Sequence, residues 1–453
     1  MSSSFYLSAA HKSSGKTLVS LGLCAALKSQ SLSVQAFKKG PDYIDPIWLC
    51  KASGHPCYNL DFYNMSNEEI QSLYQQHAQN KDVVVIEGNK GLYDGMNVSG
   101  GNANADLAKL LDIPVVLVID TNGMTRGIAP LIKGYQDFDK SIKFAGVILN
   151  KVGGQRHESK LVKAIQYYTD MEVLGSVHRS NELMIDERHL GLMPANETGG
   201  SEAMIKTIAK HINDGVDIGQ LLSVSTTKSP KSSTKVTKVE KVLRIAVAKD
   251  SAFGFYYADD LDAFESLGVG IQYFDTTKDS KLPEVDGLFI GGGFPEMKLE
   301  ALSKNKSLLN DIQQKITQGL PTYAECGGLM YLTNSITFNR KKYAMAGVID
   351  ADTIMTKRPV GRGYVELEAE DDHPWQGVSK KIYAHEFHYS KLENINPNTR
   401  YGYKVLRGVG VDNNQDGILF NNLLATYAHL RNVGGNRWVE QFVDFIKKKI
   451  ANQ

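Results

Sequence analysis

The segment of residues 5–27 constrains the fold of this chain more than any other stretch. An apolar run at residues 5–7 predicts a buried strand, and the small-residue turn after it ends in Gly15, Lys16 and Thr17, which open an amphipathic helix. Strand, turn and helix in this order, with Gly-Lys-Thr at the helix start, are typical of a phosphate-binding P-loop. The segment therefore predicts an α/β domain that binds a nucleotide.

The residue types at this turn suit phosphate chemistry. Backbone N–H groups at a helix N-terminus favour a polyphosphate, so Ser14 and Gly15 are candidate nucleotide-binding residues. Lys16 adds a mobile cation, and the Thr17 hydroxyl can hold Mg²⁺. The position five residues before Gly15, normally Gly in this motif, is Ala10, and the effect of that difference is left open. A chance Gly-Lys-Thr is common, but the flanking strand and helix favour nucleotide binding.

The composition excludes several classes of protein. With 453 residues the chain has room for two or three domains, and a net charge of +1 gives no field that would favour nucleic acid or an anionic membrane. No apolar run approaches the ~20 residues that span a bilayer, and the start lacks the build of a signal peptide, so we expect a cytoplasmic protein. Four cysteines are too few for a disulfide scaffold and show no zinc spacing.

Strands and helices alternate through the first half of the chain, which predicts a mostly parallel sheet covered on both faces. After the first strand, the predicted strands are residues 33–37, 83–86, 115–119 and 144–149. The polar residues at or just after their ends are Lys38, Glu87, Asp120 and Asn150. Open α/β sheets bind ligands at the carboxyl ends of their strands, so this recurrence is a stronger signal than any single motif.

A change in composition divides the chain. Residues 223–241 are rich in Ser, Thr, Lys and Val, which predicts an exposed linker between a domain of residues 1–222 and one of residues 242–453; a short edge hairpin is the less favoured alternative. The second domain again shows α/β signals, with predicted strands at residues 242–248, 271–274, 287–290 and 423–429 and a terminal helix at residues 436–450. We therefore predict two doubly wound α/β domains.

Cys326 is the best candidate for a nucleophile. It follows an extended segment and precedes Gly327 and Gly328, which allow a sharp turn into a helix. Such a turn presents a thiol at a helix N-terminus, which favours the thiolate. The glycine-rich turn at residues 291–293 can bring backbone N–H groups close to a developing oxyanion. A lone Cys among small residues is more often part of a core, but these two glycine-rich turns together favour catalysis.

A cysteine nucleophile needs a base, and a distant histidine is the recurring partner. The candidates in the second half are His385, His388 and His429. His429 lies at a predicted strand end, where catalytic residues of α/β folds gather, and is the preferred candidate.

Motifs spread over nearly the whole chain carry a resemblance to one family. In the first half they are Phe37-Lys-Lys-Gly-Pro-Asp-Tyr-Ile-Asp-Pro46, Asn59-Leu-Asp61, Glu87-Gly88 with Gly91-Leu-Tyr-Asp-Gly95, and Arg188-His-Leu-Gly-Leu192. In the second half they are Gly291-Gly-Gly-Phe-Pro-Glu296, Ala324-Glu-Cys-Gly-Gly328, His385-Glu-Phe-His-Tyr-Ser390 and Tyr427-Ala-His429. The sequence resembles the cobyrinate a,c-diamide synthase family of glutamine-dependent amidotransferases. The related cobyric acid synthases carry a different sequence at the Gly-Pro-Asp-Tyr-Ile-Asp-Pro run.

The resemblance implies a dethiobiotin-synthetase-like P-loop domain followed by a class I glutamine amidotransferase domain. Matched by motif, Cys326 would attack the glutamine amide with His429 as base. Arg431 lies two residues after His429, where many class I amidotransferases have a Glu that orients the base; the cobyrinate branch also lacks it. The third member of this site is left open.

The resemblance also assigns the acidic residues of the first domain. The positions that the family places around Mg²⁺, phosphate and the substrate carboxylate are Asp42, Asp45, Glu87 and Asp94. The expected metal ligands are Thr17, Asp45 and Glu87, Asp45 and Asp94 are candidate catalytic residues, and Asp42 and Asn150 are candidate nucleotide-binding residues. Asn150 could equally lie in an ordinary loop. The candidate cations for a substrate with several carboxylates are Lys38, Lys39, Arg126 and Arg188.

Asp42 and Asp45 are expected on a stiff loop, since Pro41 and Pro46 fix φ at both ends and disfavour helix before each proline. Two carboxylates near a polyphosphate would repel it unless a cation lies between them, so at least one should bind Mg²⁺. The alternative is that both aspartates cap turns, which is common beside Pro and Gly.

The function implied is ATP- and glutamine-dependent amidation of the a and c acetate carboxylates of cobyrinate through an acyl phosphate. ATP is needed because a carboxylate is a poor acylating agent, and Mg²⁺ with Lys16 would neutralise the transferring phosphoryl group. Two alternatives stay open: the same chemistry on sirohydrochlorin, nickel-sirohydrochlorin or sirohaem, and a P-loop regulatory ATPase fused to an inactive amidotransferase-like module. A homodimer is compatible with the sequence, which does not decide the oligomeric state.

Overall fold

The computed structural model describes residues 2–185, 187–188, 191–228 and 241–452, without the side chains of residues 187, 188 and 191. The chain divides into two compact units, Met1–Thr234 and Lys235–Gln453, which we describe separately. The division falls inside the predicted linker of residues 223–241.

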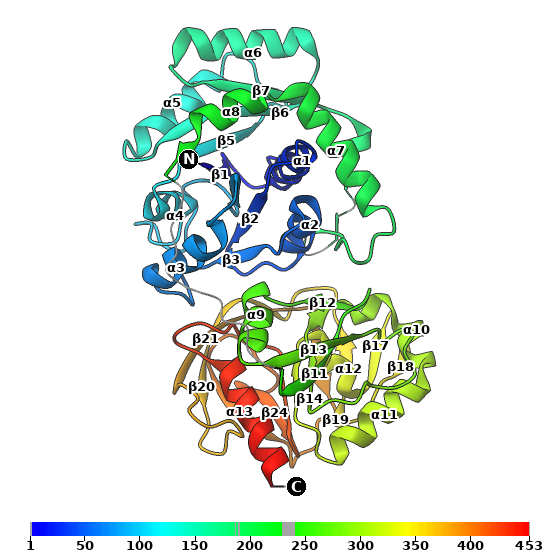
Figure 1. The fold of residues 1–453 in the computed structure, drawn as a ribbon. Coiled ribbons are helices and arrows are strands. Elements are labelled where there is room, and N and C mark those ends of the chain that lie inside the picture. Colours follow the sequence, from blue (N-terminus) through cyan, green and yellow to red (C-terminus); the bar gives the residue numbers. More distant parts are fainter. Residues whose placement is uncertain (1, 186, 189–190, 229–240, 453) are drawn as a thin grey trace. The chain divides into compact units, whose positions relative to one another are not determined.

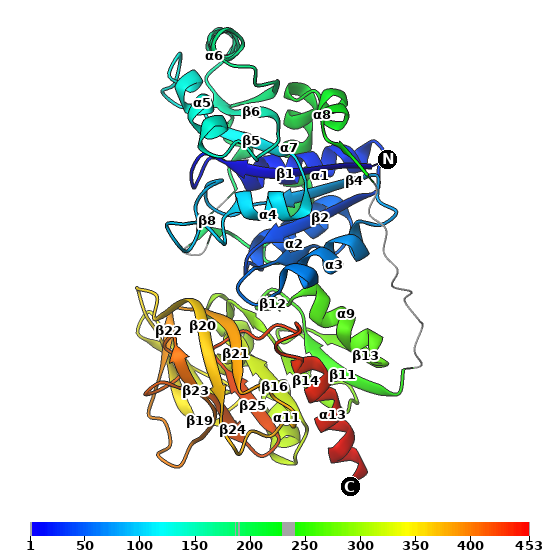
Figure 2. The ribbon, with the colours of Figure 1, turned by 90° about the vertical axis from the view of Figure 1, so that its left-hand side faces the viewer.

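The first unit is built on a sheet with the strand order β3-β2-β4-β1-β5-β6-β7, in which every neighbouring pair is parallel. Figure 2 shows β2, β4 and β1 side by side in this order. The strands are β1 (Ser2–Ala9), β2 (Val34–Lys39), β3 (Tyr58–Leu60), β4 (Val83–Glu87), β5 (Val115–Asp120), β6 (Phe144–Val152) and β7 (Val173–His178). The strands predicted from the sequence are confirmed, and where their ends differ from the prediction they do so by one to three residues.

Helices cover both faces of this sheet, as its continuous apolar strands require. They are α1 (Lys16–Ser29), α2 (Ile44–Ser53), α3 (Asn67–Ala78), α4 (Asn104–Leu111), α5 (Ile128–Phe138), α6 (Gln155–Tyr168), α7 (Ser201–Gly215) and α8 (Ile218–Val224), with a 3₁₀ turn η1 (Asn181–Leu183) and a short hairpin of β8 (Glu187–Arg188) and β9 (Gly191–Leu192). Figure 1 shows α1, α2 and α7 on one face and α3 and α4 on the other. Gly22 lets α1 and α7 pack closely, because a Cβ there would lie 2.3 Å from Cγ1 of Ile212.

The segment between Pro41 and Pro46 is not the loop that we predicted. Asp45 and Pro46 belong to the first turn of α2, where proline is tolerated because its missing N–H would have no helical partner. Asp42 caps this helix, since its Oδ1 accepts hydrogen bonds from the N–H groups of Ile44 at 2.9 Å and Asp45 at 3.1 Å. The turn-capping alternative therefore holds for Asp42.

The predicted start of the linker is also wrong. Residues 223–224 end α8, and β10 (Thr226–Thr227) pairs antiparallel with the start of β1. The N–H and the hydroxyl of Ser225 both donate hydrogen bonds to the carbonyl of Leu221, so they extend the end of α8 instead of facing solvent. The Ser/Thr-rich composition therefore did not indicate an exposed linker here. Residues 229–240 of the predicted linker lie outside the described residues.

The second unit contains a larger mixed sheet with the strand order β13-β11-β14-β16-β25-β24-β23-β20-β21. These strands are β11 (Leu243–Ala248), β13 (Val269–Phe274), β14 (Gly287–Ile290), β16 (Thr322–Glu325), β20 (Gly361–Ala369), β21 (Lys381–His388), β23 (Arg400–Arg407), β24 (Gln415–Phe420) and β25 (Leu423–Thr426). The five strands from β13 to β25 in this order are parallel, and the rest are antiparallel. The predicted last strand ends at Thr426, three residues before His429.

Smaller sheets and helices complete this unit. The additional strands are β12 (Phe253–Phe255) paired with β15 (Gly292–Gly293), and a sheet of β18 (Lys341–Ala344), β17 (Thr333–Phe338), β19 (Ile349–Met355) and β22 (Ser390–Glu393). The helices are α9 (Ala258–Ser266), α10 (Leu299–Lys304), α11 (Lys306–Thr317), α12 (Gly327–Leu332) and α13 (Trp438–Ala451), with a 3₁₀ turn η2 (Pro295–Met297).

The central sheet of the second unit separates two apolar cores. Ala246 and Ala248 of β11 pack with the leucines of α10 and α11, whereas Ile245 and Val247 pack with the aromatic residues of α9 and α13. This alternation places both faces of β11 against helices, and Figure 1 shows α9 and α13 together on one side. The doubly wound α/β class predicted from the sequence is confirmed for both units. Among the described residues, no helix is both long and apolar enough to span a bilayer.

Candidate active sites

The P-loop turn joins β1 to α1 and is closed by a residue from β6. Gly15 has φ 89°, and a Cβ there would lie 2.0 Å from Nδ2 of Asn150, so only glycine fits. The Asn150 side chain donates a hydrogen bond to the Ser14 carbonyl at 2.9 Å. Asn150 thus lies against the phosphate loop, as expected from its place at a strand end.

Lys16 is almost buried, with 8% of its surface exposed, and its ammonium group donates a hydrogen bond to the carbonyl of Lys90 at 2.6 Å. Burial, reinforced by the positive charge of Lys38, lowers the pKa of Lys16 to about 8. The P-loop lysine is therefore a cation that gives up its proton more readily than an exposed lysine.

Carboxylates from α2 and β4 surround a second lysine. The Lys38 ammonium lies 2.5 Å from Asp45 Oδ2, 2.7 Å from Glu87 Oε1 and 3.7 Å from Asp42 Oδ2. Thr17 joins the same group, because its hydroxyl lies 2.7 Å from Glu87 Oε1 and 3.3 Å from Asp45 Oδ2. Lys38 and Glu87 are paired residues of β2 and β4, so the sheet register brings them together.

The charges of this cluster are set by burial and by one another. Burial alone would lower the pKa of Lys38, but Asp45, Glu87 and Asp42 outweigh it and raise that pKa well above its usual value. Burial raises the pKa of Glu87, although Lys38 partly opposes the shift. For Asp45 the charge and hydrogen bond of Lys38 outweigh burial, and its pKa is lowered.

The three residues expected to bind Mg²⁺, namely Thr17, Asp45 and Glu87, therefore lie together. Their oxygen atoms are the donors that Mg²⁺ prefers, and Oε2 of Glu87 is buried without a hydrogen-bond partner among the described residues. No cluster of three or more His, Cys, Asp or Glu side chains within the described ranges could hold a metal ion by itself. An ion here would also need ligands from a phosphate, and it would share or replace the position of the Lys38 ammonium.

The structure shows the surroundings of the other predicted residues of this unit, whose roles stay predictions. Asp94 is exposed, and its carboxylate closes a turn by accepting the N–H of Gly91 at 2.8 Å. The ammonium group of Lys39 is buried and bonds the carbonyl and side-chain oxygen atoms of Asn102. Arg126 is exposed, and the side chain of Arg188 lies outside what the structure describes.

In the second unit, Cys326 stands at the sharp turn between β16 and α12 that the sequence predicts. Its φ is 47° and its ψ is −101°, a conformation that L-residues rarely adopt. The glycines after it allow close packing, because a Cβ at Gly328 would lie 2.1 Å from the carbonyl oxygen of Ile290. A Cβ at Gly327 would lie 3.1 Å from the backbone nitrogen of Gly293, so the predicted glycine-rich turn runs beside the nucleophile.

His429 lies next to this turn and is buried, with 2% of its surface exposed. Its ring stacks on that of His385 with 4.9 Å between centroids, and its Nδ1 lies 3.4 Å from Oε2 of Glu325. A Cβ at Gly292 would lie 2.6 Å from Cε1 of His429. Burial would lower the pKa of His429, but hydrogen bonding to Cys326 and Glu325 and their charges raise it to about 10.

The other two histidines are placed differently. Burial and the neighbouring charges of His429 and Arg431 hold the pKa of His385 well below its usual value, so it stays neutral. His388 bonds the carbonyl of Ser390 through Nδ1 at 2.8 Å and stacks on Tyr427 at 3.9 Å. The structure thus brings His429 to Cys326, while their catalytic roles stay predictions. The sequence analysis did not single out Glu325, the residue immediately before Cys326, which contacts His429.

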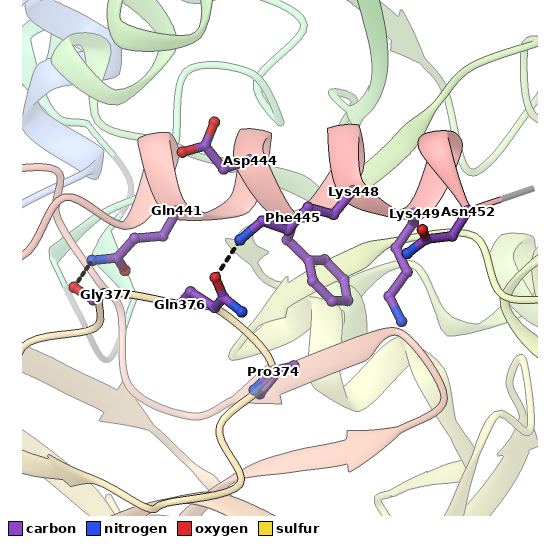
Figure 3. Close-up of a pocket in the computed structure, with 9 residues that line it drawn as sticks. All are labelled: Pro374, Gln376, Gly377, Gln441, Asp444, Phe445, Lys448, Lys449 and Asn452. Atoms are coloured by element: carbon purple, nitrogen blue, oxygen red, sulfur yellow. Dashed lines mark hydrogen bonds between the residues drawn. The ribbon is translucent and has the colours of Figure 1, made fainter.

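A surface pocket of about 450 Å³ lies apart from these residues, along α13. Figure 3 shows its lining, which includes Pro374, Gln376, Phe445 and Lys448, with a hydrogen bond from Lys448 to Gln376. None of the predicted site residues lines it.

Two family profiles match the chain. Residues 9–192 match the CobQ/CobB/MinD/ParA nucleotide binding domain, and residues 244–436 match the CobB/CobQ-like glutamine amidotransferase domain. A solved structure described as a glutamine amidotransferase is 14% identical, with a TM-score of 0.33, and covers 45% of this chain and 98% of its own.

Curated relatives match over nearly the full length. A cobyrinate a,c-diamide synthase of Magnetococcus marinus is 40% identical over 453 residues, which is 98% of this chain and 97% of the relative. The proteins of the same name from Caldanaerobacter subterraneus and Methanosarcina barkeri are 37% and 38% identical and cover 97% of this chain each, and 97% and 94% of their own lengths.

Proposed function

This chain belongs to the cobyrinate a,c-diamide synthase family and is a glutamine-dependent, ATP-using ligase, and we propose that it converts the a and c acetate carboxylates of cobyrinate to amides. The observation that supports the proposal is that one chain carries two sets of candidate catalytic residues. One is the P-loop with Thr17, Asp45 and Glu87, and the other is Cys326 at its sharp turn beside His429.

The first set activates the substrate. A substrate carboxylate oxygen attacks the γ-phosphorus of ATP, and the bond to the β-phosphate oxygen breaks, which gives an acyl phosphate and ADP. Lys16 and the backbone N–H groups of the P-loop stabilise the charge on the transferring phosphoryl group. Thr17, Asp45 and Glu87 would hold Mg²⁺, which neutralises phosphate charge when it is bound.

The second set supplies ammonia. The Cys326 thiolate attacks the side-chain amide carbon of glutamine, and the His429 imidazolium gives a proton to the leaving nitrogen. The products are ammonia and a thioester, which water hydrolyses to glutamate with His429 accepting the proton of the water. Ammonia then attacks the acyl phosphate, and phosphate leaves, so that each cycle consumes one ATP and one glutamine per amide formed.

The test offers cobyrinate with ATP, Mg²⁺ and glutamine to the purified protein and identifies the products by mass spectrometry. We expect a product in which two carboxylates have become amides. A parallel incubation with sirohydrochlorin distinguishes the alternative substrate, and amidation of sirohydrochlorin alone would overturn the proposed substrate.

Cys326→Ala should lose the glutamine-dependent reaction and keep the reaction with free ammonia, because only ammonia release uses the thiolate. A cytoplasmic location and a homodimer stay predictions.

A further inference from the structure

The residue that commonly orients the base of a class I amidotransferase is replaced here by Arg431. The guanidinium of Arg431 is directed elsewhere, since its Nε and Nη2 lie 3.1 and 3.0 Å from Asp259 Oδ2 and it lies over the ring of Tyr257. We propose that Glu325, the residue before the nucleophile, is the positioning residue of His429 and sets its tautomer. The proposal rests on the proposed glutamine hydrolysis at Cys326.

The first observation is the direction of the two carboxylate oxygen atoms of Glu325. Oε2 lies 3.4 Å from Nδ1 of His429, within the range of an ion pair. Oε1 accepts the hydroxyl of Tyr323 at 2.7 Å and the N–H of Leu430 at 2.9 Å. One carboxylate therefore contacts the imidazole and also the backbone of the residue that follows it.

The second observation is burial. The side chains of Glu325 and His429 are each 3% exposed. A buried carboxylate acts on a neighbouring imidazolium with little screening by water or salt, which makes its effect on that ring large. Its contacts are Tyr323 of its own strand and the consecutive residues His429 and Leu430 of a distant segment, so the carboxylate cannot move away without breaking a buried hydrogen bond.

The geometry fixes which ring nitrogen does the chemistry. With Nδ1 facing an acceptor, the proton of the neutral imidazole lies on Nδ1, and Nε2 is left to exchange a proton with Cys326. The titratable groups that face His429 are Cys326, Glu325 and the ring of His385. His385 is neutral, so Glu325 is the group other than the nucleophile that favours the imidazolium.

The test is Glu325→Gln. The amide oxygen of Gln keeps both hydrogen bonds that Oε1 accepts, because they fall on one atom, and the amide nitrogen then faces Nδ1 of His429. An N–H donor at that position selects the opposite tautomer, with the proton on Nε2. By comparison with loss of the orienting carboxylate of a Ser-His-Asp triad, we expect glutaminase activity to fall on the order of 10²–10⁴-fold. Ammonia-dependent amidation should be unchanged.

The pH profile of glutaminase activity distinguishes the proposed role of Glu325 from a purely structural one, because a structural role would leave the profile unchanged. In the unaltered protein the alkaline limb should lie near the pKa of His429, at about 10. In Glu325→Gln the alkaline limb should lie about one pH unit or more lower, because the imidazolium has lost its counter-charge. The rate at which iodoacetamide alkylates Cys326 at acid pH should fall about tenfold as well, followed by mass spectrometry of its peptide.

The matched control is Asp260→Asn. Asp260 is also buried and holds the same segment, through the N–H of Asn432 at 2.8 Å and the indole N–H of Trp438 at 3.1 Å. We expect its pH profile to match that of the unaltered protein. The inference is overturned if Glu325→Gln keeps the original rate and profile, or if both variants lose activity equally with no shift of the limb. The alkylation assay needs no glutamine, so it tests Glu325 even if the proposed function fails.

Discussion

The ammonium group of Lys38 and the carboxylate of Glu87 form a buried ion pair, with 2.7 Å between Nζ and Oε1 and exposed fractions of 3% and 0%. A charge so deep in a protein is costly unless it is paired, and here Asp45 shares the same cation. Lys38 thus stands where the carboxylates would otherwise need a metal ion.

Replacing Lys38 tests whether the carboxylates depend on its positive charge. We expect Lys38→Met to lower the unfolding free energy by about 3–5 kcal/mol without Mg²⁺, because two carboxylates lose their buried partner. Mg²⁺ should then raise the Tm of the variant more than that of the unaltered protein, since binding to the folded state is no longer opposed by the lysine. Lys39→Met is the control, because Lys39 bonds Asn102 instead of these carboxylates. Equal Mg²⁺ responses in all three proteins would contradict the prediction.

Changing Asp45 to Asn should lower the amidation rate much more than changing Asp42 to Asn. Asp45→Asn removes a charge that contacts Thr17 and Lys38, so amidation should fall on the order of 10²–10³-fold with either nitrogen source, comparable to a lost oxyanion donor. Asp42→Asn keeps a capping oxygen for α2 and should cost much less. The measurement is the amidation rate over a Mg²⁺ titration, with glutaminase activity as the check on folding. If both variants turn over normally at limiting Mg²⁺, this cluster is not the metal site.

Nucleotide affinity should depend on pH through Lys16. Its pKa is about 8 in the free protein, and a bound polyphosphate favours the protonated form. Below that pH the ammonium is present and affinity is full; above it, binding must take up a proton, so Kd should rise up to tenfold per pH unit. Calorimetric titration with a non-hydrolysable ATP analogue from about pH 7 to about pH 9.5 measures this. The slope should disappear in Lys16→Ala, and a flat profile in the unaltered protein would count against Lys16 as a phosphate ligand.

His429→Ala should abolish glutaminase activity and leave amidation with free ammonia, because the imidazole acts only in the hydrolysis of glutamine. The expected loss is at least as large as that of Glu325→Gln, on the order of 10⁴-fold. Glutamate release and amide formation are measured on the same preparation. If glutaminase activity survives, the base is instead His385, whose ring stacks on His429, or His388.

The sequence predicted the parts of both sites that depend on local pattern. Gly15 has a positive φ and lies against the Asn150 side chain, and Gly328 lies against the backbone of Ile290, so both positions require glycine and can be recognised in the sequence. The carboxyl ends of parallel strands meet at one edge of the sheet, which is why the positions of Glu87 and Asn150 at strand ends predict that they lie near the P-loop.

The errors lie where tertiary contacts decide. Pro46 suggested a loop, yet it occupies a helix turn that needs no N–H from it. Nothing local distinguishes Glu325 from another strand residue, because its function depends on a base that arrives from a distant part of the chain. The Ser/Thr-rich start of the predicted linker concealed β10, since a strand of two residues has no periodicity to detect.

The backbone conformation of Cys326 lowers the thermal stability of the second unit. A non-glycine residue at φ 47° costs on the order of 1–3 kcal/mol, so the nucleophile is held in place at the expense of the unit's resistance to heat. Cys326→Gly should therefore melt a few degrees above Cys326→Ala, which keeps the unfavourable backbone and lacks the thiol equally. Selection for heat tolerance alone would therefore favour loss of the nucleophile at this position.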